Sequence, residues 1–541
     1  NASLSNNNVL TTTGNTYVTT GTVNLLYNGG VVQGALAISG NTGGPATGTA
    51  SFNTGSTSYL IFNSNATVGA VTVNGNTFRN LTSTGNGAFT GYYNVAAVAG
   101  SALNFTNNTI NNITLGGTAS LTGLQQGNAA AQVITVTGNT FTNLTAGTGS
   151  GIGINAVYGG ATSTIANNTI VGFNGGGALT GIISGGTYTG SVSLNTIGNL
   201  VSTGGSNVYG INNSGATAIF RNKVYGLSGT AAGSVVAGIY LTAGTTVNIY
   251  NNLIGSLTAP NATSLLAVTG INMAASSAVN AYYNTIYLNA SSSAATFGTS
   301  GIYFATSPNL TLRNNIIVNT STAVGAGGYT AALRRVSGTT GTVPANYQAA
   351  SNNNLFYAGA PSATNLLYVE GTTTATNPHQ RLDTYKAFMA TRDQASVTEN
   401  PPFLSTAGSS NDFLHINPAV ATQVESGAAP IASYTDDYDA EARNATTPDI
   451  GADEGTFTPP ATVTLSSLTY TQTNANTGAS ATNQLANTLT LTTSGSGAQP
   501  TLTAVTVDLT GTTNVADIAA ARLYRSTSPS FSLPTATPVS T

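Results

Sequence analysis

An asparagine recurs along most of the chain at nearly constant intervals, and each copy opens a short apolar run. After Asn284 the run is Thr285-Ile286-Tyr287-Leu288, and the other copies match it in residue type. Successive asparagines are 27 to 32 residues apart. A self-similar period of this size is the signature of a solenoid in which each repeat forms one coil. The recurring positions are Asn76, Asn108, Asn139, Asn168, Asn195, Asn222, Asn252, Asn284 and Asn315, with Asn354 following at a longer interval.

A Gly-Ile pair keeps step with this asparagine. It precedes Asn252 and Asn284 by fourteen residues, at Gly238 and Gly270, and recurs in four other coils. The runs that follow both motifs are rich in Val, Ile, Leu, Phe, Tyr and Thr and are separated by Gly, Asn and Ser, which predicts strands rather than helices. Period and strand content together predict an all-β parallel β-helix of about ten coils, with equivalent residues stacked about 4.8 Å apart.

The recurring asparagine is expected to hold successive coils together. Asparagine tolerates a left-handed backbone, so we expect each copy to occupy a left-handed turn. Stacked asparagine side chains can also hydrogen-bond from coil to coil as an amide ladder. The apolar residue two places after each asparagine is expected to point into the core. The nine asparagines from Asn76 to Asn315 are therefore predicted to form a structural ladder.

On these residues the chain resembles the right-handed parallel β-helix repeat proteins over residues 50–455. The repeated Asn-Asn-Thr-Ile motif looks like the body coils of bacterial secreted members. Their terminal coils resemble the later segments Leu382–Phe403 and Thr447–Glu454. The resemblance implies a right-handed coil and a structural closing segment near its end. A fold of this kind hosts many functions, so it implies no particular activity.

Four regions are predicted. Residues 1–70 read as atypical capping coils, 71–357 as the body of the β-helix, and 358–456 as terminal coils and a capping segment. The third region holds the only helix expected, with Asp383 as its N-cap ahead of residues 384–390. After a Pro-rich linker, apolar and polar residues alternate in 461–541 as in the strands of an immunoglobulin-like sandwich. The predicted strands are 462–465, 488–491, 502–509 and 521–525.

The last region resembles the β-sandwich modules found beside neuraminidase repeats in surface proteins of the Bacteroidota. No catalytic residue of those enzymes matches, so only the module is implied. It is short for such a sandwich, which needs about 100 residues. The open edge of an incomplete sandwich is a template for another strand. We expect either further modules of the same polypeptide or head-to-tail self-association, with residues 11–27 as a candidate donor strand.

Charge is distributed very unevenly. All fifteen Asp and Glu residues lie at or after Glu370, and residues 1–369 hold six Lys and Arg but no His. The remainder therefore carries a net charge of 6 − 15 = −9, and the whole chain −3. Glycoside hydrolysis needs a pair of carboxylates, and general acid-base chemistry needs a titratable group. Catalysis on the face of the solenoid is therefore not expected.

The sequence predicts a non-enzymatic structural or adhesive protein, secreted or at the cell surface, within a fibre or filament. The alternative is a protein that binds or degrades polysaccharide along one face, as a lyase or glycosidase would. No nucleic-acid partner, membrane insertion or organic cofactor is expected, whereas surface glycans remain a candidate partner. Outward aromatic residues would serve such binding, although packing on the strands explains them more simply; they are Tyr92, Tyr93, Tyr282, Tyr283, Tyr287 and Tyr303.

Acidic residues gather in two loops near residue 440. Asp436, Asp437, Asp439 and Glu441 are the best candidates for calcium, because closely spaced loop carboxylates suit that ion. Residues 449–454 form the second acidic loop. We favour a structural role, with these carboxylates paired to Arg443 or Arg381. The two histidines, His379 and His415, have no partner at metal-ligand spacing and are expected to be loop or interface residues.

Overall fold

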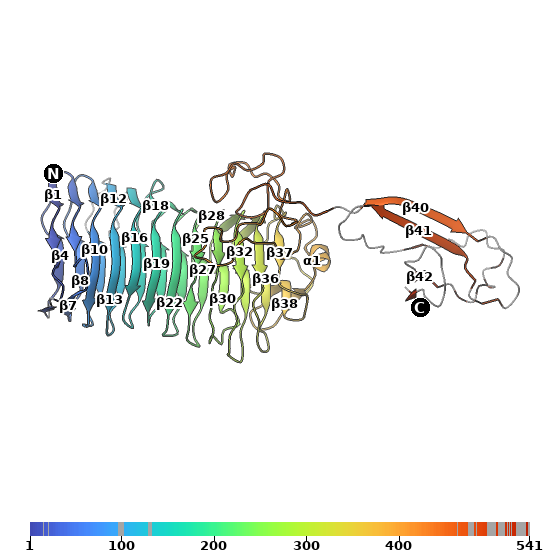
Figure 1. Ribbon diagram of the computed structural model, residues 1–541, viewed down its shortest axis with the longest axis horizontal. Helices are drawn as coiled ribbons and strands as arrows, with labels where there is room; N and C mark the ends of the chain where they lie inside the picture. Colours follow the sequence, from blue (N-terminus) through green and yellow to red (C-terminus); the bar gives the residue numbers. More distant parts are fainter. Residues whose placement is uncertain are drawn as a thin grey trace. The chain divides into compact units, whose positions relative to one another are not determined.

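The structure is a computed structural model that divides into two compact units, Asn1–Pro459 and Pro460–Thr541. It describes residues 1–14, 16–19, 21–95, 102–127, 133–461, 464–473, 481–482 and 484–494, and within the last part of the chain 505–506, 514, 516, 518, 520, 522–525 and 537–538. The first unit is a right-handed-type parallel β-solenoid of about eleven turns (Figure 1). This confirms the predicted all-β solenoid.

Three parallel sheets form the walls of the solenoid, and each coil contributes to all three. The strands of the first sheet pair in chain order from coil to coil. They are β1 (Ala2–Ser5), β5 (Leu36–Ser39), β9 (Val71–Asn74), β12 (Ala102–Thr106), β15 (Val133–Thr137), β18 (Thr164–Ala166), β21 (Ser191–Ser193), β24 (Ala218–Phe220), β28 (Thr246–Tyr250), β31 (Ala278–Tyr282) and β34 (Asn309–Arg313).

In each coil, the strand of the second sheet begins directly after the recurring asparagine. Its main path is β2 (Asn8–Val9), β6 (Thr42–Gly43), β10 (Thr77–Ser83), β13 (Thr109–Leu115), β16 (Thr140–Thr145), β19 (Thr169–Gly175), β22 (Thr196–Ser202), β25 (Lys223–Tyr225), β29 (Leu253–Gly255), β32 (Thr285–Leu288), β35 (Ile316–Asn319) and β37 (Leu355–Tyr357). Off this path lie β3 (Thr16–Thr19), β7 (Ala50–Thr54) and β26 (Ser228–Gly229).

The third sheet carries the Gly-Ile pairs. Its strands are β4 (Val23–Asn28), β8 (Ser58–Asn63), β11 (Phe89–Asn94), β14 (Leu121–Gln126), β17 (Gly151–Ala156), β20 (Leu179–Ser184), β23 (Val208–Asn213), β27 (Val236–Leu241), β30 (Val268–Met273), β33 (Thr299–Phe304), β36 (Thr330–Arg335) and β38 (Asn365–Glu370). The last member, β39 (Thr376–His379), pairs antiparallel with β38.

The Gly-Ile pair fits the narrow interior between the sheets. The isoleucines stack in register, so that Ile239 pairs with Ile271 of the next coil, and both are fully buried. A Cβ on Gly238 would lie 2.5 Å from Cγ2 of Ile254 on the opposite wall and 2.7 Å from the carbonyl oxygen of Gly270. A side chain at this position would therefore collide with backbone, which explains why the motif needs glycine.

The recurring asparagines stack inside the solenoid as a continuous ladder. In a typical link, Nδ2 of Asn252 donates to Oδ1 of Asn284 at 2.9 Å, and the backbone N–H of Asn252 donates to the same oxygen at 3.2 Å. The ladder extends beyond the nine predicted residues at both ends, through Asn41 and Asn7 toward the N-terminus and through Asn354 toward the C-terminus. Each coil is thus joined to the next by side chains as well as by the sheets.

The left-handed turn lies one residue before the ladder asparagine, which corrects the expectation that the asparagine itself adopts it. Tyr283 has φ of 53° ahead of Asn284, and Arg221 has φ of 54° ahead of Asn222. Asn, Gly or Leu takes this conformation in the other coils. The turn therefore aims the preceding side chain outward while the ladder amide points inward. The asparagine is selected for its hydrogen bonds rather than for its backbone.

A second, shorter ladder, which was not predicted, lies in the third sheet near the N-terminus. Nδ2 of Asn28 donates to Asn63 at 2.7 Å, Asn63 donates to Asn94 at 2.7 Å, and Asn94 donates to Gln126 at 2.9 Å. These side chains follow apolar residues of their strands, so they do not stand out as a repeating motif in the sequence. The N-terminal coils therefore have two rows of amides inside them.

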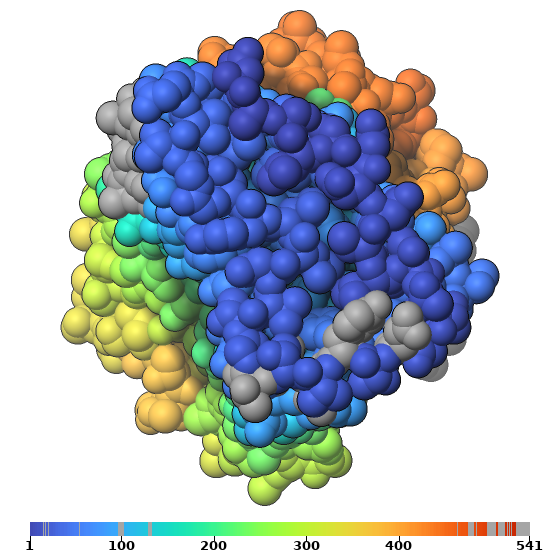
Figure 2. All heavy atoms as spheres, turned by 90° about the vertical axis from the view of Figure 1, so that its left-hand side faces the viewer, coloured from blue at the N-terminus to red at the C-terminus, as the bar shows by residue number. Residues whose placement is uncertain are grey.

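Residues 1–70 form coils whose strands join the same three sheets as those of the later coils. In these coils the wall of the second sheet is divided between two short strands, β2 and β3 in one coil and β6 and β7 in the next, and a capping role for them stays a prediction. Strands β1, β2 and β4 are the first of their sheets and pair on one side only within the described chain. Figure 2 shows this end of the solenoid, where residues of the first coil form the surface.

The opposite end of the solenoid is covered. Helix α1 (Leu382–Met389) buries Tyr385 and Met389 against the last coil. The residue at its N-cap is Arg381 rather than the predicted Asp383, which lies in the first turn and pairs with the Arg381 guanidinium at 2.7 Å. A carboxylate in the first turn still opposes the positive end of the helix dipole.

The fully buried carboxylate of Asp393 ends the asparagine ladder. Asn354 Nδ2 donates to Oδ1 of Asp393 at 2.9 Å, and the Ser396 hydroxyl donates to the same oxygen at 2.7 Å. The hydroxyls of Tyr347 and Tyr385 donate to Oδ2 at 2.6 and 2.7 Å. An acceptor-only group is suited to this place, because the last ladder amide still has an N–H to donate.

The second unit is described in part. Strands β40 (Thr464–Gln472) and β41 (Asn487–Ser494) pair antiparallel, as do the short β42 (Tyr524–Arg525) and β43 (Thr537–Pro538). Strand β41 contains the predicted strand 488–491, whereas most of 502–509 lies outside the described residues. A small antiparallel sheet is present, and the immunoglobulin-like sandwich stays a prediction.

Replacing one rung of the ladder tests its contribution to stability. In Asn284→Ala, the amides of Asn252 lose their acceptor, and the carbonyl of Ile249 loses a donor that lies 2.8 Å away. Buried groups left unpaired should lower the free energy of unfolding by about 1 to 3 kcal/mol. Denaturant titration measures the change, with Asn289→Ala at an exposed position as the control. Equal and small changes in the free energy of unfolding of both variants would show that the ladder does not stabilise the fold.

Candidate functional site

Residues 401–457, called the closing segment here, run back along the outside of the solenoid beside the second sheet (Figure 1). The outward residue after each ladder asparagine changes at this point. Six early coils have threonine there, and Thr285 retains it in one coil under the closing segment. In three other coils under this segment Leu253, Ile316 and Leu355 occupy the position and are at most 1% exposed. These side chains pack against Phe413, Ile416, Val424, Ile450 and Phe457 in clusters separate from the main core.

The left-handed turns of five successive coils hold the closing segment by its backbone. The first is Arg221, whose Nε donates to the carbonyl of Tyr438 at 2.7 Å. Nδ2 of Asn314 donates to the carbonyl of Ala429 at 2.7 Å, and the N–H of Ala429 donates back to Oδ1 at 3.2 Å. Asn251, Tyr283 and Asn353 make equivalent bonds to the carbonyls of Asp436, Ala429 and Gly427.

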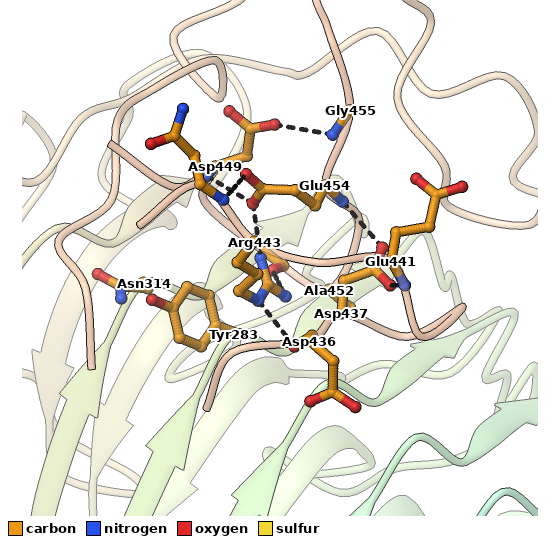
Figure 3. A network of polar contacts seen from close by, with 12 residues as sticks. Tyr283, Asn314, Asp436, Asp437, Glu441, Arg443, Asp449, Ala452, Glu454 and Gly455 are labelled. Carbon is orange, nitrogen blue, oxygen red and sulfur yellow. Dashed lines mark hydrogen bonds and ion pairs between the residues drawn. The ribbon is translucent and has the colours of Figure 1, made fainter. Parts of the chain in front are cut away.

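A buried arginine lies at the centre of this contact (Figure 3). Arg443 pairs with Glu454 at 3.1 Å and donates to Oδ1 of Asn251 at 3.0 Å and to the carbonyl of Gly451 at 2.9 Å. Its guanidinium lies 3.9 Å from the centre of the Tyr283 ring. Burial lowers the pKa of Arg443, and the Glu454 carboxylate raises it in part. The guanidinium therefore joins two coils to the closing segment.

Backbone N–H groups bind two of the neighbouring carboxylates. Asp437 accepts from Asp439 and Glu441 at 2.9 and 2.8 Å and from Glu454 at 3.1 Å. Asp449 accepts from Ser426 at 2.7 Å and from Gly455 at 3.0 Å. Burial raises the pKa of Asp449 to about 7, although these hydrogen bonds lower it in part. Both side chains shape loops and have no oxygen directed at an open cleft.

The four calcium candidates do not converge on one point. Asp436 pairs with Arg221 at 3.4 Å, and Asp437 is held by backbone as described. Asp439 pairs with Nε2 of His415 at 2.7 Å, while Glu441 is exposed. The predicted pairing with Arg443 is present, whereas Arg381 pairs with Asp383 on the surface rather than with the closing segment. The structural expectation thus fits the contacts better than the calcium expectation.

One group of potential metal ligands does form, and the sequence did not indicate it. Among the described residues, His415, Asp439 and Asp453 are the one set of three or more His, Asp or Glu side chains whose ligand atoms lie within 4.8 Å of one another. The Asp439 carboxylate raises the pKa of His415 to about 9, against the opposing effect of burial. His415 is therefore not the isolated residue that its sequence position suggested.

The outward tyrosines do not form the sugar platform considered for them. Tyr92 is fully buried in the core, and Tyr283 lies beneath the closing segment. Tyr282 contacts Tyr434 and Tyr287 contacts Phe403, both edge to face. Tyr93 is partly exposed, but its ring stacks on Phe62 and Tyr59 at centroid distances of 5.5 and 5.4 Å. Tyr303 is only 8% exposed, so three of the six tyrosines are buried and each of the other three contacts another aromatic ring.

The described part of the chain offers no pocket of ligand size among its best-formed cavities. The two best are small apolar gaps inside the N-terminal coils, each of about 10 Å³ and lined by residues such as Phe52, Phe89 and Phe105. Binding sites for small molecules usually enclose about 300 to 1,000 Å³. Chemistry along the solenoid would therefore take place on an open surface.

Comparison with protein-family profiles, with curated proteins and with solved structures found no match. The fold and its contacts are therefore the basis for assigning this chain to the parallel β-solenoid class. Among the described residues, no helix has the length and apolar character needed to cross a bilayer.

Replacing the buried arginine should release the closing segment. Arg443→Met leaves Glu454 without its cation and Asn251 without a donor, and breaking a buried pair costs about 3 to 5 kcal/mol. We expect faster hydrogen exchange at amides of residues 401–457, with the body of the solenoid unchanged. Arg381→Met, which removes an exposed pair, is the matched control and should have little effect. Unchanged exchange in Arg443→Met would contradict the central role of this residue.

The pH dependence of the same contact follows from Asp449. Its pKa rises from 3.8 to about 7 in the fold, so the native state binds a proton more tightly than the unfolded chain does. This stabilisation is complete below the unfolded pKa and is lost as the pH rises through about 7. Protease resistance of the closing segment should therefore fall between pH 4 and pH 7 and do so less steeply in Asp449→Asn. The exposed Asp412→Asn should keep the steeper profile.

Proposed function

We propose that this chain is a non-enzymatic structural or adhesive protein of a cell surface or extracellular fibre. The observation that carries the proposal is the set of contacts that the carboxylates near the solenoid make within the protein. Residues 1–369 contain none, and those of the closing segment other than the exposed Asp412 and Glu441 bind backbone N–H groups, arginines or a histidine that hold the segment in place. A catalytic carboxylate needs an oxygen free to reach substrate.

The way in which the coils are joined also suits a protein that resists mechanical force. Each coil is tied to the next by three sheets and by the ladder, and the closing segment crosses the outer edges of five coils. Few charges lie on the solenoid body, with six basic residues among the first 369. A long, regular and chemically inert surface is what a spacer or adhesive rod requires, whereas an enzyme of this shape needs a reactive site on one face.

Export and assembly extend the proposal. The resemblance to secreted bacterial β-helix proteins, and of residues 461–541 to sandwich modules of Bacteroidota surface proteins, supports a location outside the cell. Strands β1, β2 and β4 pair on one side only within the described chain, so their other edges can pair with another copy or with further residues of the same polypeptide, whereas α1 covers the other end of the solenoid. We propose self-association through these edges or through the second unit. Sedimentation of the full chain and of a chain lacking residues 1–30 would distinguish the two.

The polysaccharide alternative is tested with a panel of acidic and neutral glycans. We expect no new reducing ends and no unsaturated products, because the paired carboxylates of the closing segment are engaged in contacts within the protein. We also expect retention on glycan columns to be equal for the native chain and for Tyr93→Ala, which alters the exposed ring stack. Turnover that disappears in Asp439→Asn would refute the non-enzymatic assignment, and glycan binding that disappears in Tyr93→Ala would replace it with a binding role.

A further inference from the structure

His415, Asp439 and Asp453 come from three separate stretches of the closing segment and meet at its surface. Nε2 of His415 lies 2.7 Å from Oδ2 of Asp439, and one ligand atom of each residue lies within 4.8 Å of the other two. The side chain of Asp439 is 45% exposed and that of His415 17% exposed, so solvent reaches the group from the side of Asp439. An ion could enter there without any movement of the backbone.

Asp453 has fewer hydrogen bonds than a buried carboxylate normally needs. It is only 8% exposed, yet within the described chain it accepts one bond, from the N–H of Ile416 at 2.7 Å. Its buried neighbours Asp437 and Glu454 each accept three. Buried carboxylates are costly unless they are paired or bind a metal. The second oxygen of Asp453 accepts no hydrogen bond within the described chain, and Nδ1 of His415 is the buried polar atom of this group that has no hydrogen-bond partner there.

We propose that His415, Asp439 and Asp453 bind a divalent transition-metal ion, with Zn²⁺ as the best fit. One imidazole nitrogen and two carboxylate oxygens match the ligands that zinc accepts, with water able to fill a fourth position. Calcium prefers six to eight oxygen ligands, so the imidazole argues against it. The present contact of His415 with Asp439 is a hydrogen-bonded pair, and the ion would replace the proton shared by the two side chains.

The charges around the group permit this occupancy. Asp437 lies close enough to Asp453 to raise its pKa, so it adds negative charge on the same side. The opposing charges are Lys223, which interacts with Asp439 and donates to the carbonyl of Ser410 at 2.6 Å, and Arg443, which interacts with Asp437. His415 is itself protonated beside Asp439, so a metal ion would bind by displacing that proton from between two carboxylates.

Such an ion would fasten the closing segment to itself. It would join the turn at residues 413–416 to the acidic loops at residues 436–441 and 449–454, which otherwise meet through hydrogen bonds. Since Leu253 and Ile316 lie beneath these loops, the ion would also keep the apolar outer stripe of the solenoid covered. We assign the ion this fastening role, with a water at the position that three protein ligands leave open.

Titration of the full chain, freed of metal by chelation, with ZnCl₂ or CaCl₂ tests the proposal by calorimetry. We expect one Zn²⁺ per chain, no comparable Ca²⁺ binding, and slower proteolysis of residues 401–457 with Zn²⁺. Affinity should fall at least tenfold in Asp453→Asn and in His415→Gln and stay unchanged in Asp412→Asn and Asp436→Asn.

Two controls keep this result decisive. Circular dichroism without metal must show that the ligand variants retain the native spectrum, and Asp439→Asn provides a third variant, on the exposed ligand, that leaves the buried loops intact. The absence of stoichiometric Zn²⁺ binding, or equal Zn²⁺ affinity in all folded variants, would overturn the proposal. Calcium binding that requires Asp436 and Asp437 would instead revive the oxygen-only site.

Discussion

The hydrogen bond from one asparagine to the next is the interaction on which this solenoid depends. Parallel sheets alone leave the register between coils open to slippage, because every coil offers similar apolar residues. A buried amide removes that freedom, since a shift by one residue would leave its donors and acceptor unpaired. Between the fixed asparagines the chain can vary in length, as it does in the interval of 39 residues before Asn354. Loops therefore differ while the walls stay regular.

The closing segment shows how one repeat can serve two environments. The position after the ladder asparagine faces outward throughout, as threonine toward solvent in early coils and as Leu253, Ile316 or Leu355 beneath residues 401–457. Side chains at the left-handed turns change likewise, because Arg221 and Tyr283 stand where the earlier coils have glycine or asparagine, apart from Leu194 in one of them. A non-glycine residue in this conformation is strained. Here the strain is offset by contacts to the segment, such as the Tyr283 ring beneath Arg443.

Sequence reasoning predicted the features that recur in many coils. The period, the strands, the inward isoleucines and the amide row all follow from residues such as Asn252 and Ile254, which have counterparts in every coil. It missed features that occur once. The pairing of His415 with Asp439 spans 24 residues, and that of Arg443 with Asn251 spans 192. No local pattern encodes such contacts. The ladder residue Asn41 was missed for a simpler reason, since the first coils have irregular flanking runs.

The ladder also has a direction. Every amide presents its oxygen toward the N-terminal coil and its NH₂ toward the C-terminal coil, so the side-chain dipoles from Asn7 to Asn354 align head to tail. Aligned peptide dipoles give an α-helix partial charges at its two ends, and a row of amides is expected to do the same. Its positive end meets the buried carboxyl group of Asp393, to which Asn354 donates, and Lys386 also interacts with this group. A column of neutral side chains thus adds its positive potential to that of a lysine at a buried acid.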